Sequence, residues 1–332
     1  MKLVGLLAIA MAVTGAFAAP IAVPHAPDQR FAGLLNAPPT RPHIIDDAGG
    51  WHAPFIYRWR LANRLEQRYE EDRSVRIPLV WWTNGAFVQS SDETSAPFLL
   101  FGADSFGRDV FSRLLVGART SLALASIAAL GAMLVGGAIG GLAGYSGGSV
   151  DDALMRATDF VMVLPATYVA LALRSVLPLV LSPAKVFMLL ASIFALVGAP
   201  FIARGVRAIV RSERRSEYAS AAQALGASDA RLLLRHLLPA TRGFVAVQMT
   251  MLVPAFIVAE ATLSYVGLGF PDPVASWGTM LHDAANVSVF ADFPWLLSPA
   301  VAMFLVVLGV NLLLQGRTAG PTGSGRHVRW PM

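Results

Sequence analysis

Several features of chemically active proteins are missing from this sequence of 332 residues. It contains no cysteine, which excludes a disulfide framework, a thiolate metal site and a cysteine nucleophile. No Gly-x-x-x-x-Gly-Lys-Ser/Thr segment occurs, so there is no P-loop to bind nucleotide phosphates. None of the six histidines has the i,i+4 spacing of a zinc-binding helix. We therefore expect neither a bound cofactor nor an enzymatic activity.

Charged residues are scarce as well. They make up 14% of the chain, against roughly 25% in soluble globular proteins, and 55% of the residues are hydrophobic. Lipid is therefore the expected solvent for much of the protein. The net charge of +5 would also suit nucleic acid, but the basic residues are almost all arginine and cluster between apolar segments. This distribution is typical of membrane topology rather than of a nucleic-acid-binding face.

Six apolar segments approach the length needed to cross a membrane. A spanning helix needs about 20 apolar residues, because the hydrocarbon layer is about 30 Å thick and each residue rises about 1.5 Å. The second segment is the clearest, since no charge occurs between Arg119 and Asp151. The third is the weakest, since Asp159 and Arg174 bracket it. The segments are 3–23, 121–145, 157–177, 186–203, 244–265 and 295–315.

The first segment has a second interpretation. Lys2, an apolar run and small residues before Pro20 also describe a secretory signal with its cleavage site. The run extends to about Val23, however, which is longer than the roughly 7 to 15 apolar residues of a signal. We expect a retained first span, with cleavage near residue 19 as the alternative.

Glycines recur along the second segment at small-xxx-small spacing. Such spacing lets two helix backbones approach closely where no hydrophobic force drives helices together. We therefore expect another helix to pack on this face, although glycine is also frequent in membrane helices generally. The glycines are Gly136, Gly137, Gly140, Gly141 and Gly144.

Residues 24–114 differ in composition from the rest and are predicted to lie outside the membrane. Residues 58–73 are predicted to form an amphipathic helix, because leucines and a tyrosine recur every four residues there. Arg68 and Asp72 would pair at i,i+4. Two roles remain open for this insertion, a packed cap on the membrane domain and a separate binding module.

Arginine placement predicts the orientation. The loop 204–242 carries eight arginines against three acidic residues, so it is expected to face the cytoplasm. With six spans, both termini then lie inside, and the tail 317–332 agrees because it has arginines and no acidic residue. The insertion and the loop 267–294 lie outside by the same reasoning.

The cytoplasmic loop holds the pattern that is most informative about function. It reads EYASAAQALGASDARLLLRHLLPA from Glu217. Gly226 is a candidate C′ residue after a first short helix, and Ser228 is a candidate N-cap of a second helix that Pro239 ends. Leucines of the second helix form an apolar ridge. Such a stiff helix pair suits a socket for a cytoplasmic partner, and an ordinary interfacial element is the alternative.

The spacing of this loop resembles the EAA loop of binding-protein-dependent ABC importer permeases. That pattern runs Glu-Ala-Ala, three residues, glycine and, after a gap, an apolar-x-Leu-Pro ending. Ser220 stands here for the acidic residue and His236 for the apolar one. Other stretches over about residues 102–315 resemble the dipeptide and oligopeptide branch, namely GADSFGRDVFSRLLVGARTSL from Gly102, GLAGYSGGSVDDALMRATD from Gly141, and EATLSYVGLGFPDPVASWGTML from Glu260.

This resemblance implies the MetI-like, type I ABC importer permease fold, an all-α integral membrane protein with six transmembrane helices and an outer insertion after the first. It implies an inner-membrane, second-type permease subunit that works with a paralogous permease, two cytoplasmic ATPase subunits that bind the ATP, and an extracytoplasmic solute-binding protein. The expected divisions are a first transmembrane helix 1–23, the insertion 24–114, a permease core 115–316 with the coupling loop 204–242, and a cytoplasmic tail 317–332.

The resemblance also assigns roles to residues of the coupling loop, whereas Glu260 in the fifth span is singled out by its charge alone. Glu260 is a candidate gate or pathway residue, because an uncompensated charge in a span is costly. A buried ion pair is the other interpretation of Glu260. The residues expected to dock and couple the ATPase are Glu217, Ala221, Ala222, Gly226, Ser228, Arg235, Leu238 and Pro239.

Two charge clusters flank the second span. At its outer start, Asp109 and Arg113 are spaced to pair at i,i+4, as a structural cap or as a rim that meets the binding protein. At its inner end, the charges from Asp151 to Asp159 are expected to be interface charges rather than a proton relay.

The resemblance favours di- or oligopeptides or peptide-like solutes as the cargo, with nickel chelates and peptide antibiotics as alternatives within the same family. A function of a different class is a polytopic membrane enzyme with an active site at the insertion and Glu260, which would act without any ATPase. An ion-coupled transporter is a third interpretation, but it expects charges at the membrane midplane, and here they lie mainly at span ends.

Overall fold

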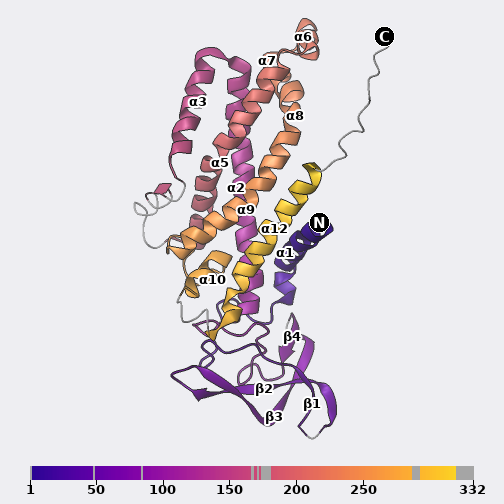
Figure 1. Ribbon diagram of the computed structural model, residues 1–332, viewed down its shortest axis with the longest axis vertical. Coiled ribbons are helices and arrows are strands. Elements are labelled where there is room, and N and C mark those ends of the chain that lie inside the picture. The colour runs from indigo at the N-terminus through magenta and orange to yellow at the C-terminus, as the bar shows by residue number, and fades with distance from the viewer. Residues whose placement is uncertain are drawn as a thin grey trace, which may run out of the picture.

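The computed structural model describes residues 2–47, 49–83, 85–165, 168–169, 172, 181–285 and 292–318. They form a bundle of long helices with a four-stranded sheet at one end (Figure 1). The helices are α1 Lys2–Ala22, α2 Val110–Ser146, α3 Gly148–Val163, α5 Pro183–Glu213, α6 Glu217–Ala224, α7 Asp229–Leu232, the π-helix η1 Leu233–Leu237, α8 Leu238–Ala240, α9 Arg242–Tyr265, α10 Trp277–Asp283, the 3₁₀-helix η2 Pro294–Leu297 and α12 Ser298–Thr318.

Five of the described helices are long and apolar enough to cross a membrane, namely α1, α2, α5, α9 and α12. Five of the six predicted segments coincide with them. α2 already begins at Val110, before the predicted start at 121, and α5 continues to Glu213, beyond the predicted end at 203. The apolar stretch marks only the part of a helix that lipid surrounds, whereas these helices continue through polar residues at their ends.

The third predicted segment, 157–177, is described only in part. α3 runs from Gly148 to Val163 and packs against α2 and α5. Much of the remainder of the predicted span lies outside the described residues, so a sixth membrane helix stays a prediction.

The closest helix pair in the bundle is α2 with α5. A Cβ atom added to Gly136 would lie 2.4 Å from the carbonyl oxygen of Ala199, and one added to Gly140 would lie 2.3 Å from that of Ala203. Gly144 meets Arg207 in the same way, at 2.6 Å. Glycine at every fourth position therefore lets the two backbones touch, as the small-xxx-small spacing predicts.

The segment between α1 and α2 folds as an antiparallel sheet of order β1-β2-β3-β4. Residues 58–73, predicted as a helix, belong mostly to β2 and β3, so that prediction is wrong and the protein is mostly helical rather than all-α. Aromatic and β-branched side chains dominate the start of β2 and the end of β3, and such residues favour strands. The strands are β1 His43–Ile45, β2 Trp51–Asn63, β3 Arg68–Thr83 and β4 Ala86–Ser90.

A polar turn, and not a helix, produces the repeat of leucines and tyrosine. The side chain of Asn63 accepts a hydrogen bond of 2.9 Å from the backbone N–H of Leu65 and so starts the β2–β3 turn. Leu65 at that turn is 97% exposed, so its four-residue spacing from Leu61 and Tyr69 does not mark a buried helix face. The register places Asp72 opposite Arg58 and not beside Arg68, so the predicted i,i+4 pair is wrong too.

The insertion has a small core of its own. Ile56, Ile77 and Leu79 of the sheet pack with Ala96 and Phe98 of the segment that leads back to the helices. The cluster is small for a region of this size. Because α1 and α2 hold both ends of the insertion, its unfolded chain has less conformational entropy to lose on folding.

The α2–α5 contact generates a stability prediction. We expect Gly140→Ala to lower the free energy of unfolding by about 1–3 kcal/mol, because the new methyl group meets a backbone carbonyl that cannot move aside. Gly137→Ala is the matched control, since a Cβ there has no atom within 4 Å. Thermal unfolding of the purified protein in detergent measures both, and equal midpoints for the two variants would contradict the proposed contact.

Candidate functional site

Residues 217–240, which comprise α6, α7, η1 and α8, connect α5 to α9 and are called the α6–α8 segment below. The segment lies at the end of the bundle opposite the sheet (Figure 1). Sequence reasoning assigned its docking residues to this loop. The structure shows which side chains anchor the segment and which are available to a partner.

The turn between α6 and α7 has the predicted form. Gly226 adopts φ +83°, a left-handed conformation that favours glycine. Its N–H donates to the carbonyl of Gln223 at 2.9 Å, and the N–H of Ala227 donates to that of Ala222 at 3.0 Å, which together make a Schellman motif. Ser228 then caps α7 by accepting from the N–H of Arg231. Both the C′ and the N-cap predictions are confirmed.

Most of the predicted leucine ridge faces the bundle rather than a partner. Leu232 and Leu237 are fully buried and belong to one apolar cluster with Val206 and Val210 of α5. Ala219 of α6 joins the same cluster, whereas Leu234 is 65% exposed. The leucines therefore anchor the segment on α5, and burial of such side chains contributes about 1.5–3 kcal/mol each.

Pro239 does not end the second helix, so that prediction is wrong. It lies at the start of α8, where its missing N–H costs no helical hydrogen bond. The π-helix η1 widens the turn just before it, and α9 begins at Arg242. The chain is thus helical almost without interruption from α7 into α9.

Polar contacts attach the segment to the C-terminal end of α2. The hydroxyl of Tyr145 donates to Asp229 at 2.5 Å. Arg214 donates to the carbonyl oxygen of Tyr145, and its guanidinium lies 4.5 Å from the centre of the tyrosine ring. Tyr218 donates to Glu213 at 2.8 Å. These contacts fix both α6 and α7 relative to α2 and α5.

The residues assigned to docking divide into two groups. Glu217, Ala221, Gly226, Ser228 and Arg235 are exposed, whereas Ala222, Leu238 and Pro239 are half-buried. Sequence reasoning missed Leu225, which is 89% exposed at the end of α6. The sequence did contain an indication of this, because Leu225 lies at i,i+4 spacing from Ala221 and Glu217. The three residues therefore share one helix face. That exposed face is the surface that a partner can reach.

Charges on α3 are paired with arginines of α5. Asp151 accepts from Arg207 at 2.5 and 2.6 Å and from Arg211 at 3.3 Å, and Asp159 accepts from Arg204. Carboxylates held this way form structural ion pairs, and the expectation that they do not form a proton relay stays a prediction.

Glu260 of α9 lies in a cradle of serine hydroxyls. It accepts from Ser264 at 2.7 Å, from Ser276 at 2.8 Å and from Ser121 of α2 at 3.0 Å, and its side chain is fully buried. No cation contacts it within the described residues, so the ion-pair interpretation is not supported there. Ser276 is also the N-cap of α10. Glu260 therefore joins α2, α9 and α10 at the end of the bundle near the sheet.

A second network joins the start of α2 to the loop after α9 and to the end of α10. Arg108 donates to Asp104 at 2.7 Å, to Asp272 at 2.8 Å and to Asp283 at 2.5 Å. Arg113 contacts Asp283 at 3.4 Å and Asp104 at 3.6 Å. Burial raises the pKa of Asp283 although both arginines lower it. The predicted pair of Arg113 with Asp109 is wrong, because Arg113 contacts Asp104 and Asp283 instead.

Asp109 acts as the predicted cap. It accepts from the N–H groups of Phe111 and Ser112 at the start of α2, and its Oδ2 lies 3.1 Å from Nδ1 of His25. Nε2 of His25 lies 2.6 Å from Glu93. Burial by itself would lower the pKa of His25, but hydrogen bonds to the two carboxylates raise it to about 9.

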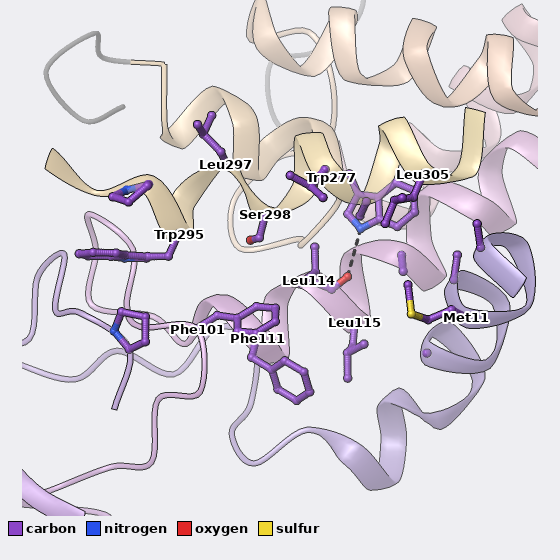
Figure 2. Close-up of a pocket in the computed structure, with 18 residues that line it drawn as sticks. Met11, Phe101, Phe111, Leu114, Leu115, Trp277, Trp295, Leu297, Ser298 and Leu305 are labelled. Carbon is purple, nitrogen blue, oxygen red and sulfur yellow. Dashed lines mark hydrogen bonds between the residues drawn. The ribbon is translucent and has the colours of Figure 1, made fainter. Parts of the chain in front are cut away.

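An apolar cavity of about 520 Å³ lies between α1, α2 and α12 (Figure 2). The indole of Trp277 donates to the carbonyl of Leu114 and that of Trp295 to Ala103, both at 3.1 Å, so the N–H groups are already used. No charged side chain of the described residues lines the cavity. A solute with charged ends finds no counter-charge there, so this cavity does not fit a polar solute.

The sequence is similar to known transport proteins over most of its length. The profile of the family described as "Binding-protein-dependent transport system inner membrane component" matches residues 136–316. The oligopeptide transport system permease protein OppC of Bacillus subtilis (strain 168) is 37% identical over 217 residues, or 65% of this chain and 68% of that protein. A putative peptide transport system permease protein of Brucella suis biovar 1 is 39% identical over 274 residues, or 77% and 88%. An inward-facing structure of the MetNI methionine ABC transporter is similar with a TM-score of 0.46 and 16% identity, over 61% of this chain and 95% of that one.

The His25 contacts generate a pH prediction. The folded-state pKa of about 9 exceeds the ordinary value of 6.5, so the stabilisation is fully present below about pH 6.5 and is lost as the pH rises through 9. We expect it to reach about 3 kcal/mol. His25→Gln should remove this dependence, which denaturant unfolding between about pH 6 and pH 10 measures. Parallel pH profiles for the native protein and the variant would contradict the assignment.

Proposed function

Because this chain belongs to the family of binding-protein-dependent transport system inner membrane components, we propose that it forms part of the pathway by which an ATP-binding cassette importer carries di- or oligopeptides. Like its relatives, the protein is a multi-pass inner-membrane permease subunit and not an enzyme. The peptide cargo rests on the names of the relatives. Nickel chelates and peptide antibiotics are the alternative cargoes within the family.

The observation that carries the proposal is the construction of the α6–α8 segment. Its leucines bind it to α5, its polar residues bind it to α2, and one helix face stays exposed toward the side away from the sheet. A segment that is rigidly held and yet exposed can receive a push from a partner. We assign ATPase docking to the exposed Glu217, Ala221, Gly226, Ser228 and Arg235, together with Leu225, and a supporting role to Ala222, Leu238 and Pro239.

α9 supplies the connection from this segment to the other side of the membrane. It starts at Arg242, next to the α6–α8 segment, and holds Glu260 about 27 Å further along, at about 1.5 Å per residue. Glu260 fastens α9 to α10 through Ser276. Movement of α9 would therefore change the position of α10, and this geometry supports a gating role for Glu260 in which it makes no contact with the solute.

The division of the chain follows from the same reasoning. We assign 1–23 to a first transmembrane helix, 24–114 to an outer insertion, 115–316 to a permease core of five further helices with the coupling loop 204–242, and 317–332 to the cytoplasmic tail. Both termini would face the cytoplasm. The separation of the sheet and the α6–α8 segment to opposite ends of the bundle supports this orientation (Figure 1).

Membership of the family implies substrate-binding and ATPase partners. Beyond that, we propose a paralogous permease subunit as the second half of the pathway and two ATPase subunits, which bind the ATP. Because this chain has no P-loop, the ATP of such an importer would be bound by these partners. In the reconstituted complex, uptake of a labelled dipeptide should require ATP and the binding protein, and uptake without any ATPase would overturn the proposal.

Thiol labelling tests the orientation, because the chain has no cysteine of its own. Leu65→Cys and Leu225→Cys are matched variants, since the native side chains are 97% and 89% exposed. A membrane-impermeant maleimide should label position 65 in intact cells and position 225 only after permeabilisation. Bound ATPase should then protect position 225. Labelling of position 225 from outside would contradict the docking assignment.

The Schellman turn generates a prediction about coupling. Gly226→Pro is expected to reduce peptide uptake at least about tenfold while ATP hydrolysis continues, because proline cannot adopt φ +83° and has no N–H to donate. Gly243→Ala is the control, since this nearby glycine has no atom within 4 Å of an added Cβ. Uptake and hydrolysis are measured in the same proteoliposomes. Normal uptake by the proline variant would count against the role of this turn.

A further inference from the structure

Charge is distributed unevenly along the outer sheet. Residues 77–91, which hold the end of β3, the following turn and β4, contain no charged side chain. The residues before them, from 58 to 76, contain six arginines and four acidic residues. The lack of charge therefore distinguishes this part of the sheet from the rest of it.

The uncharged end exposes three aromatic side chains, Trp81, Trp82 and Phe87, called the aromatic tip below. Their exposed fractions are 50%, 70% and 43%. The ring of Phe87 packs edge-on against both indoles, with centroid distances of 5.4 Å to Trp81 and 4.9 Å to Trp82. The three rings form one contiguous apolar surface, and large exposed apolar surfaces mark places where proteins meet a partner or a membrane.

The aromatic tip lies next to the exit of α1 from the membrane. Figure 1 shows β4 beside the end of α1, and the two elements are in contact. The side chain of Gln89 in β4 donates to the carbonyl of Pro24, two residues after α1 ends, at 2.7 Å. α1 has 21 residues and is about 31 Å long, close to the hydrocarbon thickness. Its end, and with it β4, therefore lies at the level of the headgroups.

From these observations we propose that the aromatic tip inserts into the interfacial layer of the outer leaflet and anchors the outer sheet to the lipid surface. Tryptophan suits this layer because its ring is apolar and its N–H can meet polar headgroups. The absence of charge over residues 77–91 removes the cost of bringing a charged side chain to the lipid. The charged end of the sheet, with Leu65 at its turn, stays in water.

The proposal is tested with single thiols in the full chain, reconstituted in vesicles of phosphatidylethanolamine and phosphatidylglycerol. Thr83→Cys carries an environment-sensitive fluorophore beside the aromatic tip and leaves its three rings intact. Leu65→Cys carries the same fluorophore at the charged end. A nitroxide on the acyl chain near the headgroup should quench the fluorophore at position 83 at least about twofold more than that at 65, because interfacial residues reach roughly 5–10 Å into the bilayer. Aqueous iodide should show the reverse order.

Equal quenching by iodide at both positions would overturn the proposal. So would protection of position 83 that appears only when the companion permease or the binding protein is added, because the tip would then be a protein interface. As a second variant, Thr83→Cys combined with Trp81→Ser, Trp82→Ser and Phe87→Ser should lose the lipid quenching, while the fluorophore at position 65 in the same background stays unchanged. Persistent lipid quenching in that variant would also contradict the role of the three rings.

Discussion

Backbone contact between α2 and α5 is the constraint on which the rest of the structure depends. In lipid no hydrophobic force draws two helices together, so close packing must do so. Gly136, Gly140 and Gly144 provide it by removing the side chains between the two backbones. One end of α2 then lies at the network around Arg108, and the other end holds Tyr145, which contacts Asp229 of the α6–α8 segment. α5 supplies the apolar surface for Leu232 and Leu237. The structures at both ends of the bundle are thus attached to this one helix pair.

The two ends are built from different chemistry. The α6–α8 segment is anchored on α5 by apolar side chains, and one of its helix faces stays exposed. The end near the sheet is held by buried charge and hydroxyl groups, with Arg108 at the centre of three carboxylates and Glu260 among three serines. A partly satisfied polar network is costly, so the polar end is restricted to few arrangements. Apolar packing at the other end imposes no such restriction.

Sequence reasoning located the parts that depend on local pattern. Apolar length identified the five described spans, glycine spacing identified the α2–α5 contact, and Gly226 and Ser228 identified the turn of the α6–α8 segment. Sequence reasoning failed where one pattern fits either a helix or a pair of strands. In residues 58–73 the four-residue repeat suggested a helix, but the turn at Asn63 divides the segment into two strands. It also failed for two distant partners, Asp283 of Arg113 and Ser121 of Glu260, because each lies more than 130 residues away along the chain.

The packing of α1 against α12 joins two helices that lie far apart in the sequence. Gly5 and Gly309 meet so closely that a Cβ on Gly5 would lie 2.6 Å from the carbonyl oxygen of Gly309. Because α12 follows α1, α2, α5 and α9 in the chain, this face of α1 gains its protein partner only after those helices have been synthesised. A close backbone contact of this kind therefore forms late in the assembly of the described bundle.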